Sequence, residues 1–224
     1  MHLHVPDGVL PNAVWSISLA VALLVLVLTS RASRANAPSP GYSGALGALM
    51  LAAMAVEIPL GPLEYHLTLI GPLGVLLGPV YVFPVIFIVN LILAFLGHGG
   101  LTVVGLNALV LGAGAALARP AYRVLARRAS PAAAFAGATA LAQVVSGALW
   151  LAVVVTALRG GVPESSALGA RAGILSALAF PMWMLGIVTE SVVAWGTGRF
   201  LARVRPDLLP GAANPTPRAA AEAG

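Results

Sequence analysis

The residues best suited to chemistry are histidines at the start of the chain. The sequence opens with Met1-His2-Leu3-His4, which places two imidazoles close to the terminal amine. A histidine at position 2 allows the amine, the His2 amide nitrogen and the His2 imidazole to chelate one ion in fused rings. Such a nitrogen set suits a tetragonal site, and therefore Ni(II) or Cu(II), with Co(II) as a further candidate. Chelation through the amine requires removal of the formyl group and retention of Met1. The alternative is that His2 and His4 are ordinary interfacial residues.

His66 is the candidate for a fourth ligand. It stands just before the apolar run that begins at Leu67, although a single histidine at a helix start is more often structural. His98 lies between glycines, where it can bind metal or hydrogen-bond the carbonyls at a helix end, and we expect the second. The chain has no cysteine, so any transition-metal site must use histidine, carboxylate or backbone nitrogen.

Glu190 is the one acidic residue inside the last apolar run, where an ionised side chain is costly. It is either a functional residue or structural glue that bonds a buried amide. The amides available in the other apolar runs are Asn90, Asn107 and Gln143.

The composition is that of a protein dissolved in lipid. Of the 224 residues 59% are hydrophobic and 8% are charged, against about 25% charged in a soluble domain. The net charge of +5 comes from arginines clustered beside apolar runs, a pattern that favours orientation in a membrane over nucleic-acid binding. The chain lacks the P-loop, H-E-x-x-H and G-x-S-x-G motifs, so we expect no ATP hydrolysis by this chain and no enzyme activity. The remaining enzyme alternative would use Glu190 with the histidines.

The apolar runs predict an all-α integral membrane protein, a bundle of about seven transmembrane helices. The stretch 67–96 is too long for one helix at about 1.5 Å per residue in a hydrocarbon core of about 30 Å. We therefore divide it at Gly78-Pro79 into a short helix and a second one. The other predicted helices cover residues 13–29, 42–59, 101–117, 131–158 and 173–195. Residues 1–205 are expected to form a single membrane domain and 206–224 a disordered cytoplasmic tail.

The arginines predict the orientation of this bundle. With the amino terminus outside and seven spans, ten of the 12 basic residues fall on the inner side, and only Arg159 and Arg171 fall outside. The carboxyl terminus is then cytoplasmic, and all four histidines lie on the outer side.

Two segments resemble a known family. The opening His-Val-Pro-Asp-Gly-Val-Leu of residues 4–10 resembles the Met-His-Ile-Pro-Asp-Gly-x-Leu start of the CbiM/NikM family. Residues 97–107, Gly-His-Gly-Gly-Leu-Thr-Val-Val-Gly-Leu-Asn, resemble the family signature Gly-x-Gly-Gly-x-Thr-x-x-Gly-x-Asn. His66 ahead of a Leu-Gly-Pro step and Glu190 in the last helix match as well, and the resemblance runs to about residue 205.

The resemblance implies the substrate-capture component of an energy-coupling-factor transporter for cobalt or nickel in the inner (plasma) membrane, linked to cobalamin biosynthesis. Such a component takes Co²⁺ or Ni²⁺ as substrate and works with a transmembrane coupling (T) subunit, cytoplasmic ATPase subunits and, in some systems, a small accessory membrane subunit. The implied metal ligands are the terminal amine of Met1, an amino-terminal histidine, His2 or His4, and His66. The competing interpretation is a structural or assembly subunit without a ligand of its own.

This sequence departs from the family pattern at its start. Alignment on Pro6-Asp7-Gly8 makes His4, not His2, the counterpart of the family's second residue. Either His2 has taken over the chelating role, or translation begins at codon 3 with an alternative start codon that is read as Met. Our hypothesis is the second, and an intact Met1 in metal-carrying protein, found by mass spectrometry, would contradict it. The sequence does not choose between cobalt and nickel, although the Pro-Asp-Gly opening leans toward cobalt.

Overall fold

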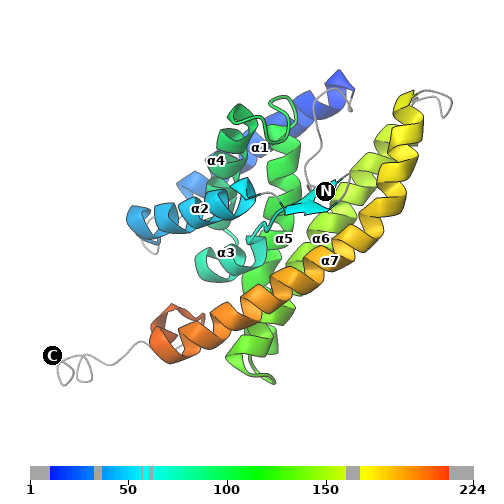
Figure 1. The fold of residues 1–224 in the computed structure, drawn as a ribbon. Helices are drawn as coiled ribbons and strands as arrows, with labels where there is room; N and C mark the ends of the chain where they lie inside the picture. The colour runs from blue at the N-terminus through cyan, green and yellow to red at the C-terminus, as the bar shows by residue number, and fades with distance from the viewer. Residues whose placement is uncertain (1–10, 33–36, 57, 61–62, 160–166, 212–224) are drawn as a thin grey trace, which may run out of the picture.

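The computed structural model describes residues 11–32, 37–56, 58–60, 63–159 and 167–211. Among these residues it contains seven α-helices, a two-stranded hairpin and a short 3-10 helix (Figure 1). The elements are α1 (Asn12–Arg31), α2 (Pro40–Ala55), β1 (Ile58–Leu60), β2 (Leu63–Tyr65), α3 (Ile70–Leu77), α4 (Val82–Phe95), α5 (Val104–Leu125), α6 (Pro131–Arg159), α7 (Ala167–Val204) and η2 (Pro206–Leu208). The helical membrane bundle expected from the sequence is confirmed.

Apolar side chains on the outside of the bundle require lipid as the solvent. Within α1, described along its whole length, Ala22 alone is buried, while Ile17, Leu24 and Leu28 are each more than half exposed. In the described part of the chain, α1, α5 and residues 131–153 of α6 are long and apolar enough to cross a membrane.

The division of the stretch 67–96 is confirmed, and it produces an unusually short helix. α3 has 8 residues and covers about 12 Å at about 1.5 Å per residue. Gly78 ends it with a φ of 81°, a conformation that favours glycine because it has no Cβ. α4 follows from Val82, so two helices of unequal length take the place of one long one.

Several predicted boundaries were wrong. α2 ends at Ala55 rather than at residue 59, because β1 pairs antiparallel with β2, with Ile58 opposite Tyr65. Pro59 has no N–H with which to continue a helix. α5 begins at Val104 rather than at residue 101 and continues to Leu125. α7, with 38 residues, extends beyond the predicted 173–195 at both ends.

The carboxyl-terminal segment is structured at its beginning. Pro206–Leu208 form η2, and Leu209 is buried against the hydrophobic core, although we expected a disordered tail from Pro206. Arg205 donates to the Asp207 carboxylate, with 2.7 Å between the Arg205 Nη2 and Asp207 Oδ2 atoms. The remainder of the expected tail, residues 212–224, lies outside the described residues.

The helices α5 and α6 form the packed centre of the molecule, and the long α7 packs along α6 (Figure 1). The α5 and α6 helices run antiparallel, since Ser146 donates to the Val110 carbonyl near one end while Tyr122 packs edge-on against Phe135 near the other. The α6 and α7 helices are antiparallel as well, and the Trp183 indole donates to the Gln143 carbonyl across them at 3.0 Å. Small residues allow these backbones to approach closely.

α3 is inserted into this centre against α5 and α6. All its residues except Leu76 are buried. A Cβ on Gly71 would lie 2.6 Å from the Thr139 Cα, and a Cβ on Gly74 would lie 2.8 Å from the Ala118 Cβ and closer still to the Ala115 carbonyl oxygen. The two glycines therefore set how closely α3 approaches its neighbours.

The substitution Gly74→Ala is expected to destabilise the protein by about 1–3 kcal/mol, because an added methyl group in a filled site forces the backbones apart. The matched control is Gly44→Ala in α2, where a Cβ would meet nothing within 4 Å. Thermal unfolding of the detergent-purified variants measures the difference. Equal melting temperatures for the two variants would contradict the close packing of α3.

Candidate functional site

His66 lies at the point where the β1–β2 hairpin leads into the bundle. It follows β2 directly and is 5% exposed. Four residues further on, α3 begins at Ile70. The segment between them belongs to no helix or strand, and non-helical backbone at membrane depth is tolerated where protein surrounds it. The buried side chains of Tyr65, Thr68 and Leu69 meet that condition.

A carboxylate from α7 binds this segment. Glu190 is 1% exposed, and its Oε1 atom accepts from the Thr68 backbone N–H at 2.5 Å and from the Thr68 hydroxyl at 2.6 Å. Its Oε2 atom accepts from the Leu69 N–H at 3.1 Å. The Gln143 amide of α6 donates to the same Thr68 hydroxyl at 2.8 Å. We call these four residues, Glu190, Thr68, Leu69 and Gln143, the Glu190 network.

The Glu190 network closes the amino-terminal end of α3. Leu69, the N-cap residue, adopts a left-handed conformation with a φ of 53° and provides no side-chain cap. The first N–H groups of a helix have no partner within it, and the helix dipole favours negative charge at that end. Glu190 supplies an acceptor for the N–H of the N-cap residue from a different helix.

Arg119 of α5 closes the opposite end of α3. Its Nε atom donates to the Val75 carbonyl at 2.8 Å, and its Nη2 atom donates to the Leu76 carbonyl. A Cβ on Gly78 would lie 2.8 Å from the guanidinium, which would have to shift, and the φ of 81° at this position also favours glycine. A cation at the carboxyl end of a helix is favourable because of the helix dipole. α3 is thus held by an acidic residue at one end and a basic residue at the other.

The structure assigns Glu190 a role that the sequence left undecided. The Gln143 amide donates to the Thr68 hydroxyl, which in turn donates to the Glu190 carboxylate. The Asn90 amide instead donates to the Ile86 carbonyl of its own helix. Thr68 was not among the predicted site residues, and Arg119 entered the prediction only as a signal of topology. The available signals were the hydroxyl of Thr68 within an apolar run and the position of Arg119, one helical turn before the next arginine.

His98 lies in the turn that ends α4. Its backbone N–H donates to the Leu93 carbonyl at 2.9 Å, and the Gly97 N–H donates to the Ala94 carbonyl at 3.2 Å. Gly97 has a φ of 87°, so these bonds form a Schellman motif. The backbone N–H of His98 therefore bonds a carbonyl at the end of α4.

The amino-terminal ligands Met1, His2 and His4 lie outside the described residues. Among the residues that the structure does describe, no group of three or more His, Cys, Asp or Glu side chains could hold a metal ion. His66 is accordingly the one predicted metal ligand whose surroundings are described.

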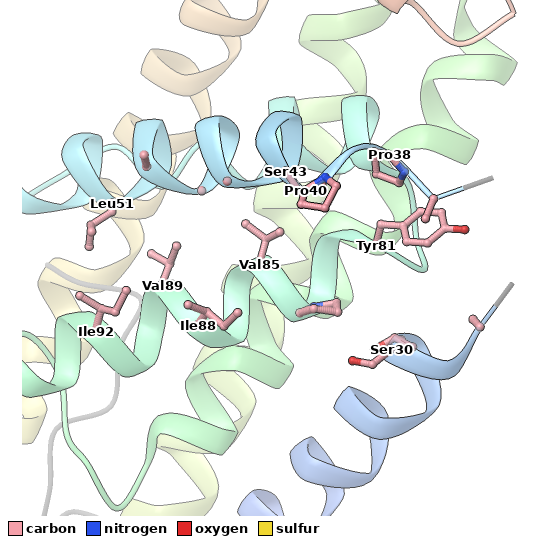
Figure 2. Close-up of a pocket in the computed structure, with 17 residues that line it drawn as sticks. Ser30, Pro38, Pro40, Ser43, Leu51, Tyr81, Val85, Ile88, Val89 and Ile92 are labelled. Atoms are coloured by element: carbon pink, nitrogen blue, oxygen red, sulfur yellow. The ribbon is translucent and has the colours of Figure 1, made fainter. Parts of the chain in front are cut away.

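A separate groove lies between α2 and α4 and opens toward the end of α1 (Figure 2). Its volume is about 650 Å³, and its walls are mostly apolar, with Leu51 of α2 on one side and Val85, Val89 and Ile92 of α4 on the other. His66, the predicted metal ligand that the structure describes, does not line it.

Comparison with known proteins identifies the family. Residues 4–208 match the CbiM family, described as the cobalt uptake substrate-specific transmembrane region. The chain belongs to the CbiM family. It is 32% identical to a cobalt transport protein CbiM from Sorangium cellulosum, with 92% of this chain and 94% of that protein covered. It is 28% identical to a putative fused cobalt transport protein CbiMQ from Methanocorpusculum labreanum, of which it spans 36%.

Solved structures show the same fold. A crystal structure of a transition metal transporter matches with a TM-score of 0.72 at 18% identity, over 90% of this chain and 93% of that one. A truncated transition metal transporter matches with a TM-score of 0.69 at 17% identity, over 89% of this chain and 98% of that one. This CbiM-family chain is therefore a multi-pass membrane component of metal transport and not an enzyme.

Replacing Arg119 tests whether its bonds to the carbonyls at the carboxyl end of α3 stabilise the protein. Arg119→Ala is expected to lower stability by about 1.5–3 kcal/mol, because buried carbonyls lose a charged donor. Arg123→Ala, on an exposed position of the same helix, is the matched control and should leave stability unchanged. Thermal unfolding in detergent measures both, and an unchanged melting temperature for Arg119→Ala would contradict this role.

Proposed function

We propose that this CbiM-family chain is the metal-capture component of an energy-coupling-factor transporter that imports Co²⁺ or Ni²⁺. The observation that carries the proposal is the setting of His66, which is buried where the hairpin enters the bundle and is continuous with a segment bound by α7. A ligand held in this way can meet a second set of ligands with a fixed geometry.

The second set of ligands is the amino-terminal chelate. The terminal amine, the next amide nitrogen and the adjacent imidazole supply three nitrogens, and His66 supplies the fourth. The adjacent imidazole is His2 if Met1 begins the mature chain and His4 if the chain begins at codon 3. The family's cobalt uptake description and the Pro-Asp-Gly opening favour Co²⁺, while four nitrogen ligands suit Ni²⁺ equally.

Delivery of the metal requires other subunits. The chain has no P-loop, so ATP hydrolysis falls to cytoplasmic ATPase subunits through a transmembrane coupling subunit. The name of the fused relative, CbiMQ, supports a second component that works beside the capture domain. A small accessory membrane subunit is compatible with the same arrangement. The inner (plasma) membrane is where such an assembly meets both incoming metal and cytoplasmic ATP.

The proposed orientation places the amino terminus and His66 outside. The arginine bias supports it, and so does the pairing of Arg119 with the carboxyl end of α3, since both then lie toward the arginine-rich inner side.

Because the chain has no cysteine, single introduced cysteines report which side of the membrane a residue faces. In intact cells an impermeant maleimide should label Ser165→Cys and spare Ala129→Cys. The reverse pattern would remove the access of incoming metal to the site.

Removal of the amino-terminal ligands is the direct test of the function. A deletion of residues 1–4 and the substitution His66→Ala are each expected to abolish Co²⁺ and Ni²⁺ uptake while leaving membrane insertion intact. His98→Ala is the matched histidine control and should transport normally. Metal analysis of the purified protein, with the two ions in competition, gives the preference. Unchanged uptake in both ligand variants, or no bound metal at saturation, would favour a structural or assembly subunit instead.

A further inference from the structure

We propose that Glu190 is a positioning residue for His66, so that the metal affinity of the capture site is set from helix α7. The inference rests on the proposed function, because it assigns a consequence to His66 as a ligand. It goes beyond that function in naming residues remote from the amino terminus that control how tightly the ion is bound.

Two consecutive residues of α7 hold the chain on both sides of His66. On one side, the Tyr65 hydroxyl lies 2.5 Å from the Thr189 hydroxyl. Thr189 also donates to the Leu185 carbonyl at 2.9 Å, so its single proton is used there and Tyr65 is the donor between the two hydroxyls. On the other side, Glu190 accepts from both the backbone and the side chain of Thr68. His66 and Leu67 are therefore bracketed by two attachments to one turn of α7.

The Glu190 attachment fixes direction as well as distance. Its carboxylate accepts from three donors on two successive residues, the Thr68 N–H, the Thr68 hydroxyl and the Leu69 N–H. Two oxygens that bind three groups in this way restrict rotation of the segment as well as its displacement. Gln143 then limits the Thr68 rotamer from the side of α6. The backbone that leads from α3 back to His66 is thus anchored two residues from the imidazole.

A cap that only stabilised α3 would not require a residue from another helix. A serine, threonine or asparagine at the N-cap position satisfies the first N–H groups of a helix from its own side chain. The N-cap residue here is Leu69, which provides no side-chain cap, and Glu190 of α7 accepts from Thr68 and from the Leu69 N–H, ahead of the first helical residue. A local cap would stabilise α3 alone. The bonds to Glu190 hold the segment that carries His66 and couple it to α7.

Metal ligands are sensitive to this kind of support. Residues that orient a ligand without touching the ion typically change metal affinity by about 10- to 100-fold when they are replaced. A chelate of nitrogens tolerates little error in the direction of its fourth ligand, because the ion's preferred geometry is directional. Loss of the Glu190 network should therefore weaken metal binding more than it weakens the fold.

The first experiment uses Glu190→Gln in the full-length, detergent-purified protein. The amide keeps the shape and one acceptor but presents an NH₂ group to the Leu69 N–H. The dissociation constants for Co²⁺ and Ni²⁺, measured by calorimetry, are expected to rise about 10-fold or more. The visible absorption spectrum of the Ni²⁺-loaded protein is expected to shift, because His66 is reoriented relative to the other ligands. The melting temperature of the metal-free protein gives the structural effect separately.

A pair of variants at Thr68 keeps the proposal testable even if Glu190→Gln does not fold. Thr68→Val removes the hydroxyl at nearly constant shape and should weaken metal binding in the same direction. Thr68→Ser restores the hydroxyl and should return the affinity to that of the unmodified protein. The matched control is Ser146→Ala, which removes a buried hydroxyl that donates to the Val110 carbonyl between α5 and α6. It should lower the melting temperature and leave metal affinity unchanged.

The outcomes separate this inference from the proposed function. If His66→Ala abolishes binding while Glu190→Gln and Thr68→Val bind metal normally, Glu190 only stabilises α3 and the inference fails with the function intact. An affinity loss in Ser146→Ala as large as that in Glu190→Gln would also overturn the inference, because general destabilisation would explain both. If His66→Ala binds metal normally, it is the proposed function that fails.

Discussion

The hydrogen bonding of α3 is the constraint on which the rest of the molecule depends. A helix of 8 residues has partners within itself for few of its N–H and C=O groups, since four of each are left over at the ends. In lipid there is no water to bind them. Two side chains of other helices bond the ends of α3: Glu190 accepts from the N–H of the N-cap residue Leu69, and Arg119 donates to the Val75 and Leu76 carbonyls. An acidic residue at the amino end and a basic residue at the carboxyl end suit the helix dipole.

Close packing makes this arrangement possible. Gly71 and Gly74 bring α3 against the backbones of α6 and α5. At that separation the Glu190 side chain reaches the backbone just ahead of α3, and the Arg119 side chain reaches the last carbonyls of α3. A larger side chain at either glycine would push α3 out and leave buried polar groups without partners, which is costly in an apolar surrounding. The small residues and the charged caps therefore act together.

The same arrangement gives His66 its setting. The hairpin delivers the histidine to the bundle, and the segment that follows is bound by α7 before α3 begins. Hydrogen bonds, in addition to apolar contact, therefore join the hairpin and the segment after it to the packed helices. Such bonds are directional, so they define an orientation that apolar packing in lipid would leave looser. Hydrogen bonds to α6 and α7 thus hold the backbone on both sides of His66.

The sequence by itself determined the class of protein, the number of helices and the break at Gly78-Pro79. These follow from composition, the length of apolar runs and the conformational limits of glycine and proline, which are all local properties. It also singled out His66 and Glu190, because polar residues beside or within apolar runs are costly and therefore informative. The hairpin after α2 and the extent of α7 were not predictable in this way, since strand pairing and tertiary packing decide them.

Only the tertiary structure decided what Glu190 and Arg119 do. Their partners, Thr68 and Val75, lie far from them in the sequence, and no pattern of spacing relates the two sets. The sequence left Glu190 undecided between function and structure because burial alone does not name a partner. It counted Arg119 only as a charge near a membrane surface. Both roles arise because α3 is too short to satisfy its own backbone, a requirement that only its place in the bundle could answer.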